Sequence, residues 1–112
     1  MVEIKNHIWI TENDRPVLGN GRYQLLLKIL ETGSLSKAAK EMSLSYKKAW
    51  KLINSMNSNA EKVLVETSTG GKNGGGTHVT EYGLYLMDKF CKAKEINKLT
   101  LIDINDKIFN HD

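Results

Sequence analysis

Two short helices joined by a two-residue connection constrain the fold of this chain more than any other feature. Ser34 and Ser45 are each suitable helix N-caps, and Ser43–Leu44 connects the two segments. Apolar residues recur at helical spacing after each cap. The two stripes are Leu35, Ala38, Ala39 and Met42, and Ala49, Leu52, Ile53 and Met56. Small alanines at a helix crossing beside a tight turn predict a helix-turn-helix.

The segment before this motif predicts a hairpin and a further helix. Residues 8–11 are β-branched and aromatic, residues 12–16 are turn-like, and residues 17–18 can form a short return strand. Residues 22–31 carry apolar side chains at helical spacing, and Gly33 fits the stop position of a helix.

The segment after the motif predicts a wing and a last helix. Residues 63–67 and 77–79 predict two strands around a loop that holds five of the nine glycines. Thr80 then caps a helix expected to run to about Lys98. The predicted fold class is mainly α with small β-hairpins, a winged helix-turn-helix with a long C-terminal dimerisation helix.

Chain length bounds the domain organisation. A chain of 112 residues suits one domain, which we expect over residues 1–98, followed by an acidic C-terminal tail over residues 99–112. No apolar run approaches the roughly 20 residues of a membrane span, and the N-terminus lacks a signal-peptide pattern. With one cysteine no internal disulfide forms, and the expected location is cytoplasmic.

Positive charge is concentrated in the middle of the chain. The net charge is only +3, but seven lysines face three glutamates between Lys37 and Lys72, whereas the tail is acidic. A localised basic surface indicates a nucleic-acid partner better than net charge does. A helix fits the major groove, so we expect the basic helix after Ser45 to contact DNA. The expected contact residues are Lys37, Ser45, Tyr46, Lys47, Lys48 and Lys51.

The alternative for these lysines is an ordinary solvated helix face, which the preceding short helix and the wing disfavour. Trp50 lies near the edge of the apolar stripe, and we expect it to pack rather than to stack on bases. The glycine-rich loop is not a phosphate-binding P-loop, because Gly76–Thr77 stands where Lys and Ser or Thr would be required. Glycines with one lysine suit close approach to DNA, so Thr69 and Lys72 join the expected contacts.

Catalytic chemistry has little support in these residues. His7, His78 and His111 lie in separate segments without metal-site spacing, and Cys91 is expected to be a buried thiol. We therefore expect no enzyme, no metal and no cofactor.

The last helix has apolar residues over an unusually wide arc, which predicts one face on the domain and one on a partner subunit. The first face comprises Tyr82, Leu86, Phe90 and Ala93. The second, the expected dimerisation face, comprises Leu84, Met87 and Cys91.

Several stretches together resemble the N-terminal DNA-binding domain of ModE-type molybdate-responsive transcription regulators. The resemblance covers about residues 4 to 98. Generic LysR-like winged helices share its helix-turn-helix part but not its glycine run. The matching stretches are residues 33–40, 45–50, 56–57, 64–66, 69–76 and 80–84.

This resemblance implies a dimer whose last helix pairs the subunits and whose third helix reads the major groove. Members of that family also carry a C-terminal oxyanion-binding region, and the chain ends about where that region would begin. We therefore expect a sequence-specific double-stranded DNA-binding transcription regulator that acts as a homodimer on an inverted repeat and lacks its own oxyanion-sensing domain. A separate sensor protein is a possible further partner. The alternative hypothesis is a protein–protein adaptor that docks through the last helix, and RNA binding ranks third because no aromatic platform is visible.

Overall fold

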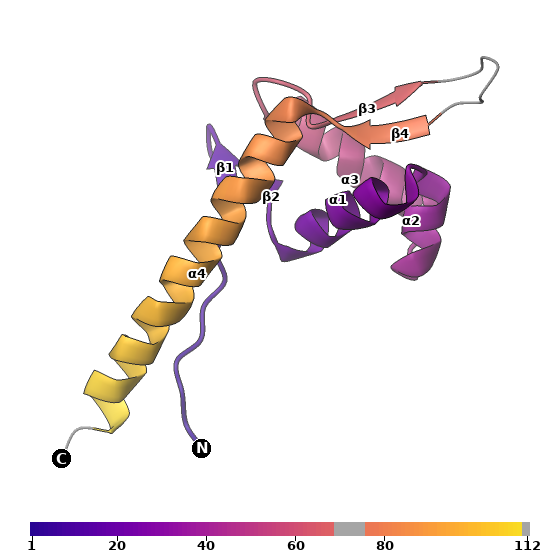
Figure 1. The fold of residues 1–112 in the computed structure, drawn as a ribbon. Helices are drawn as coiled ribbons and strands as arrows, with labels where there is room; N and C mark the ends of the chain where they lie inside the picture. Colours follow the sequence, from indigo (N-terminus) through magenta and orange to yellow (C-terminus); the bar gives the residue numbers. More distant parts are fainter. Residues whose placement is uncertain (69–75, 111–112) are drawn as a thin grey trace.

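A computed structural model describes residues 1–68 and 76–110, and it shows a small helical body from which one long helix projects (Figure 1). The molecule measures 67 × 29 × 19 Å along its principal axes. Its elements in chain order are β1 (Ile10–Glu12), β2 (Arg15–Leu18), α1 (Asn20–Thr32), α2 (Leu35–Glu41), α3 (Tyr46–Asn59), β3 (Val65–Ser68), β4 (Gly76–Val79) and α4 (Glu81–Phe109). This arrangement is the predicted winged helix-turn-helix.

The helix-turn-helix forms as its local signals predict. The Ser34 hydroxyl accepts the backbone N–H of Lys37 at 3.1 Å, and the Ser45 hydroxyl accepts that of Lys48 at 3.0 Å. Each cap satisfies a backbone donor that the first turn of the helix leaves without an internal partner. Between the helices, Ser43 adopts a left-handed φ of 57°, which turns the chain sharply from α2 into α3.

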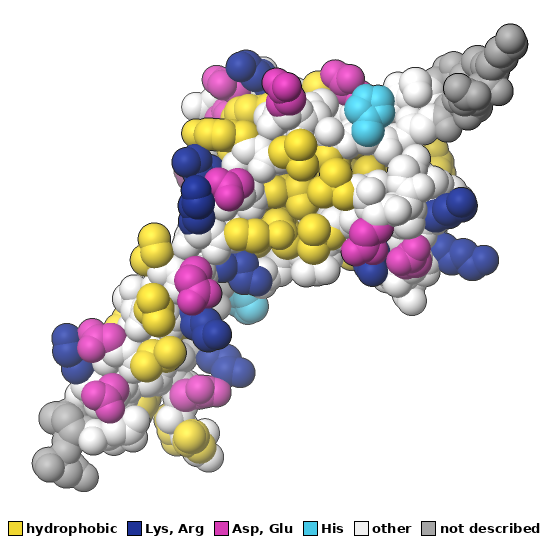
Figure 2. All heavy atoms as spheres, in the orientation of Figure 1, with side chains coloured by type: hydrophobic (Ala, Val, Ile, Leu, Met, Phe, Trp, Pro, Cys, Tyr) yellow, Lys and Arg dark blue, Asp and Glu magenta, His cyan; other side chains and the backbone are white. Residues whose placement is uncertain are grey.

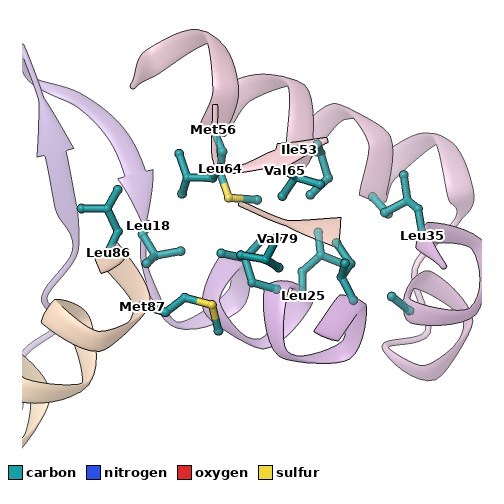
Figure 3. Packing of buried hydrophobic residues seen from close by; sticks show 14 of the residues in the cluster. Leu18, Leu25, Leu35, Ile53, Met56, Leu64, Val65, Val79, Leu86 and Met87 are labelled. Carbon is teal, nitrogen blue, oxygen red and sulfur yellow. The ribbon is translucent and has the colours of Figure 1, made fainter. Parts of the chain in front are cut away.

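The core lies where α1, α3, the wing and the start of α4 meet (Figure 3). Leu25 and Met56 have no exposed surface, and Phe90 of α4 is 1% exposed. Burying a large apolar side chain of this kind contributes about 1.5–3 kcal/mol each. The same core fixes the orientation of α3, since Ala49, Ile53 and Met56 face inward from it.

The two hairpins are antiparallel and separate. β1 pairs with β2 through a turn at Asn13 and Asp14, which both have positive φ, as two-residue hairpin turns require. β3 pairs with β4 in the wing, with Val65 opposite Val79. The wing is joined to the body by the Thr77 N–H, which donates to the Gly33 carbonyl at 3.0 Å.

Asn57 at the end of α3 makes a second attachment of the wing. Its side-chain nitrogen donates to the Val65 carbonyl at 2.9 Å, and its side-chain oxygen accepts the Leu64 N–H at 2.8 Å. The wing therefore has a fixed position relative to α3, the helix that carries four of the eight expected DNA contacts.

The last helix is longer than predicted. We expected it to end near Lys98, but α4 continues to Phe109. Residues 99–109 contain no glycine or proline, and Lys107 pairs with Asp103 one turn earlier at 3.0 Å. The extended N-terminal segment runs beside this distal half (Figure 1).

Two contacts hold that segment against α4. Asn6 and Asn97 exchange side-chain hydrogen bonds of 3.0 and 2.7 Å. Asn105 accepts the Ile4 N–H at 2.6 Å and donates to the Ile4 carbonyl at 3.0 Å.

Within the described part of the chain, no helix combines the length and the apolar character of a membrane span.

Candidate nucleic-acid interface

One face of α3 is left open to solvent by the core. Ala49, Ile53 and Met56 point inward with at most 6% exposure, and the opposite face is polar. Since helical neighbours recur every three to four residues, the exposed positions fall on one stripe. The outer stripe comprises Lys47, Trp50, Lys51 and Asn54, all exposed.

The lysines of α3 are electrostatically available. Lys47, Lys48 and Lys51 are exposed and take part in none of the ion pairs among the described residues. Lys28 of α1, in contrast, pairs with Glu31 and Glu41 at 3.3 and 3.4 Å. Among the described residues, therefore, no carboxylate forms an ion pair with the lysines of α3.

The start of α3 presents two further expected contacts. Tyr46 is 57% exposed in the first turn, and Ser45 is exposed beside it. The Ser45 oxygen already accepts the Lys48 N–H, so this residue has a structural task in starting the helix. Its hydroxyl hydrogen is not required by that cap and remains able to donate to an acceptor outside the protein.

Lys37 lies on the neighbouring helix. It occupies the first turn of α2 with an exposed side chain, and its backbone N–H donates to Ser34. The structure therefore places the expected contacts of α2 and α3 on two consecutive, rigidly packed helices. Thr69 and Lys72, the expected contacts at the tip of the wing, lie outside the described residues.

Trp50 does not pack into the core as expected. Its side chain is 50% exposed, and it is not among the apolar residues that pack against the core cluster. The helical spacing of the stripe explains this result, because Trp50 lies three residues after Lys47 and four before Asn54. Helical spacing measured from Lys47 and Lys51, rather than from the apolar residues, would have predicted from the sequence that Trp50 is exposed.

The expected dimerisation residues divide between two environments. Leu84 is 46% exposed and Cys91 is exposed, but Met87 is only 5% exposed and belongs to the core. Met87 is turned by about 40°, one ninth of a helical turn, from Cys91 toward the side that meets the body. Its assignment to a partner-facing surface is wrong, and so is the expected burial of Cys91.

Cys91 contacts the helical body through Tyr23. Their sulfur and hydroxyl oxygen lie 2.8 Å apart. The hydrogen bond with Cys91, together with partial burial, raises the pKa of the Tyr23 hydroxyl. The thiol is thus positioned against α1, and neither its setting nor the rest of the described chain brings three potential metal ligands together.

The distal half of α4 exposes apolar side chains in the segment that we expected to be a tail. Leu99, Ile102 and Phe109 are 58%, 59% and 44% exposed. Figure 2 shows hydrophobic side chains along this helix, between charged ones. Leu84, Cys91, Ile102 and Phe109 fall on one line along the helix at about 100° per residue. We call these four residues the pairing stripe.

Comparison with known proteins matches the part of the chain that forms the helix-turn-helix and the wing strands. The family model of bacterial regulatory helix-turn-helix proteins of the lysR family matches residues 21–84. The transcriptional regulator ModE of Yersinia pestis is 51% identical over 85 residues, which cover 76% of this chain and 32% of that protein.

Two further relatives match over a similar length. The DNA-binding transcriptional dual regulator ModE of Escherichia coli K12 is 41% identical over 85 residues, 76% of this chain and 32% of its own length. The molybdenum transport protein ModE of Azotobacter vinelandii is 41% identical over 86 residues, 77% of this chain and 32% of its own. The chain spans about a third of the length of these curated relatives.

Proposed function

This chain belongs to the lysR family of bacterial regulatory helix-turn-helix proteins, which are DNA-binding transcription regulators, and we propose that it reads duplex DNA as a homodimer. The observation that carries the proposal is the outer face of α3, where three exposed lysines have no ion-pair partner among the described residues. Unneutralised charge on a rigid helix suits a polyanion with a groove of helical width.

In the proposed complex α3 enters the major groove. Residues near its start, Ser45 and Tyr46, reach base edges, and Lys47, Lys48 and Lys51 contact phosphates or guanine acceptors. Lys37 of α2 contacts a phosphate at the edge of the groove. We also propose that Thr69 and Lys72 contact the flanking backbone or minor groove.

The proposed homodimer forms through α4. The pairing stripe exposes apolar side chains toward both ends of this helix, with the charged Glu95 and Lys98 on the same side between them, and a second copy offers the same stripe. A two-fold pair is self-complementary and presents two α3 helices related by symmetry. The expected operator is therefore an inverted repeat whose half-sites lie about one or two helical turns apart, at roughly 10 bp per turn.

DNA reading is proposed for this segment alone. One relative is named for molybdenum transport, and this chain spans about a third of its length, so a molybdate response is not carried over.

Selection of bound duplexes from a random library, with and without molybdate, tests the proposed function. We expect enrichment of an inverted repeat, and salt-sensitive binding to the recovered duplex. Enrichment that changes with molybdate would assign a sensing role to the chain as well. Failure to bind any duplex at low salt would contradict DNA reading and favour an adaptor that docks partners through α4.

A further inference from the structure

Trp50 lies at the edge of the outer stripe of α3, on the side nearer Ile53, and about one turn from both Lys47 and Asn54. Lys47 precedes it by three residues, and Lys51 and Asn54 follow it by one and four. Its side chain is 50% exposed, whereas Ala49 beside it in sequence has no exposed surface. The rigid body of the helix therefore presents a large apolar ring among polar and cationic side chains.

Within the described part of the protein, the Trp50 ring makes no cation–π contact and its N–H makes no hydrogen bond. The cation–π contacts there involve the rings of Tyr82, Tyr85 and Phe90, and none involves Trp50. The hydrogen bonds of the described residues likewise include none from its indole N–H. A tryptophan normally uses both its apolar face and its N–H when it is buried or at an interface. The partner of this ring is therefore sought outside the protein.

We propose that Trp50 is a specificity-determining residue that packs the edge of its ring against the C5-methyl group of a thymine in the major groove. This inference rests on the proposed function and deepens it. The thymine methyl is the one apolar group that base pairs display in that groove, and apolar side chains are the groups that read it. Where the lysines on either side contact phosphates, those contacts hold the helix in the groove and carry no sequence information of their own.

The neighbouring Asn54 supports an A·T-containing step. An asparagine side chain pairs with adenine through N6 and N7 in the major groove. Asn54 follows Trp50 by one helical turn, about 6 Å along the axis, so the two side chains reach the same base pair or adjacent ones. An indole and an amide in this register match the methyl and the adenine edge that A·T pairs present.

The chain has only two tryptophans, so fluorescence can report on the proposed contact. Trp9 lies in the N-terminal segment, and replacing it by phenylalanine leaves Trp50 as the only tryptophan. We expect the emission of Trp9→Phe to be quenched or shifted when the inverted-repeat duplex recovered by selection is added. A random duplex, held by phosphate contacts, is expected to give a smaller change.

The decisive experiment pairs protein variants with single thymine-to-deoxyuridine replacements, which remove only the methyl group. For the unaltered protein, we expect one such replacement in each half-site to weaken binding about threefold to tenfold. The Trp50→Ala variant should bind the unmodified duplex more weakly by at least a similar factor. Its affinity should not change further when the thymine is replaced by deoxyuridine. This loss of additivity is the signature of direct contact.

Matched variants separate this contact from other effects. Trp50→Phe keeps an aromatic ring and should retain part of the sensitivity, and Ser58→Ala, further along the exposed face of α3, should retain all of it. Melting curves should show that Trp50→Ala folds, because its side chain is half exposed. If the protein binds duplex with salt sensitivity but Trp50→Ala still responds fully to each replacement, the thymine contact is wrong and the proposed function stands. If the unaltered protein binds no duplex, the proposed function and this inference fail together.

Discussion

At the scale of single residues, Gly83 controls how closely α4 approaches the body. A Cβ atom built on this glycine would lie 2.5 Å from the Leu64 carbonyl oxygen and 2.6 Å from a methyl carbon of Val79. The first of these neighbours is backbone, which cannot rotate away. The same Leu64 carbonyl accepts the Thr80 N–H at 2.8 Å, so a shift here would also disturb the start of α4.

Gly83→Ala is therefore expected to destabilise the protein by about 1–3 kcal/mol through overpacking, although alanine is the better helix former. The matched control is Gly21→Ala in α1, where a Cβ would meet nothing within 4 Å. That variant should gain up to about 1 kcal/mol from helix propensity. Urea unfolding of both at one protein concentration measures the difference, and a stabilising Gly83→Ala would refute the close approach.

At the scale of elements, the two serine caps provide a matched pair. Ser34 and Ser45 accept backbone N–H groups at 3.1 and 3.0 Å, at the starts of α2 and α3. Replacing either by alanine should cost about 1 kcal/mol of folding stability. Only Ser45 is also an expected DNA contact.

Comparing the two alanine variants therefore separates capping from recognition. Thermal melting should show similar losses for Ser34→Ala and Ser45→Ala, because the lost hydrogen bonds are alike. Fluorescence anisotropy with the selected duplex should show the larger loss of affinity for Ser45→Ala. Equal affinities for the two variants would remove Ser45 from the proposed contacts and leave it a cap alone.

The elements also show what could be predicted from the sequence. The starts of α2, α3 and α4 depend on caps at Ser34, Ser45 and Thr80, which act over three residues and are visible in the sequence. The extent of α4 depends partly on contacts such as that between Asn105 and Ile4, 101 residues apart, which no local pattern reveals.

The environments of Met87, Cys91 and Trp50 were missed for a related reason. Helical spacing groups residues into faces, but it does not say which face meets the body. The wide apolar arc of α4 could be divided in more than one way into a core face and a partner face. The structure places Met87 in the core and Cys91 at the surface. The basic face of α3 was predictable because its lysines stand opposite a clear apolar stripe.

At the scale of the whole molecule, α4 extends far beyond the body (Figure 1) and has hydrophobic side chains between charged ones on its surface (Figure 2). The pairing stripe lies on this helix. Ile102→Glu places a charge on the pairing stripe, where burying it in the proposed dimer contact without a partner is costly. We expect the dimer dissociation constant to rise at least tenfold. Affinity for the inverted repeat should fall as well, because two linked α3 helices bind more tightly than one.

Sedimentation equilibrium measures this change directly. Thr100→Glu is the matched control, since Thr100 is exposed on the same helix but lies away from the pairing stripe. Its hydroxyl donates to the Ile96 carbonyl of its own helix. This control should leave the dimer unchanged. Equal effects of the two variants, or a protein that is monomeric throughout, would contradict pairing through the stripe.

The salt dependence of duplex binding tests the central claim, that the outer face of α3 binds DNA. The slope of log K against log salt concentration reports the number of phosphates neutralised, at about 0.9 per contact. Lys47→Ala combined with Lys51→Ala should weaken binding and reduce that slope by about 2 per protomer. The control, Lys5→Ala with Lys107→Ala, removes the same charge from two exposed lysines in surface ion pairs remote from α3. We predict an unchanged slope for this control, and equal slopes for the α3 variant and the unaltered protein would contradict the account.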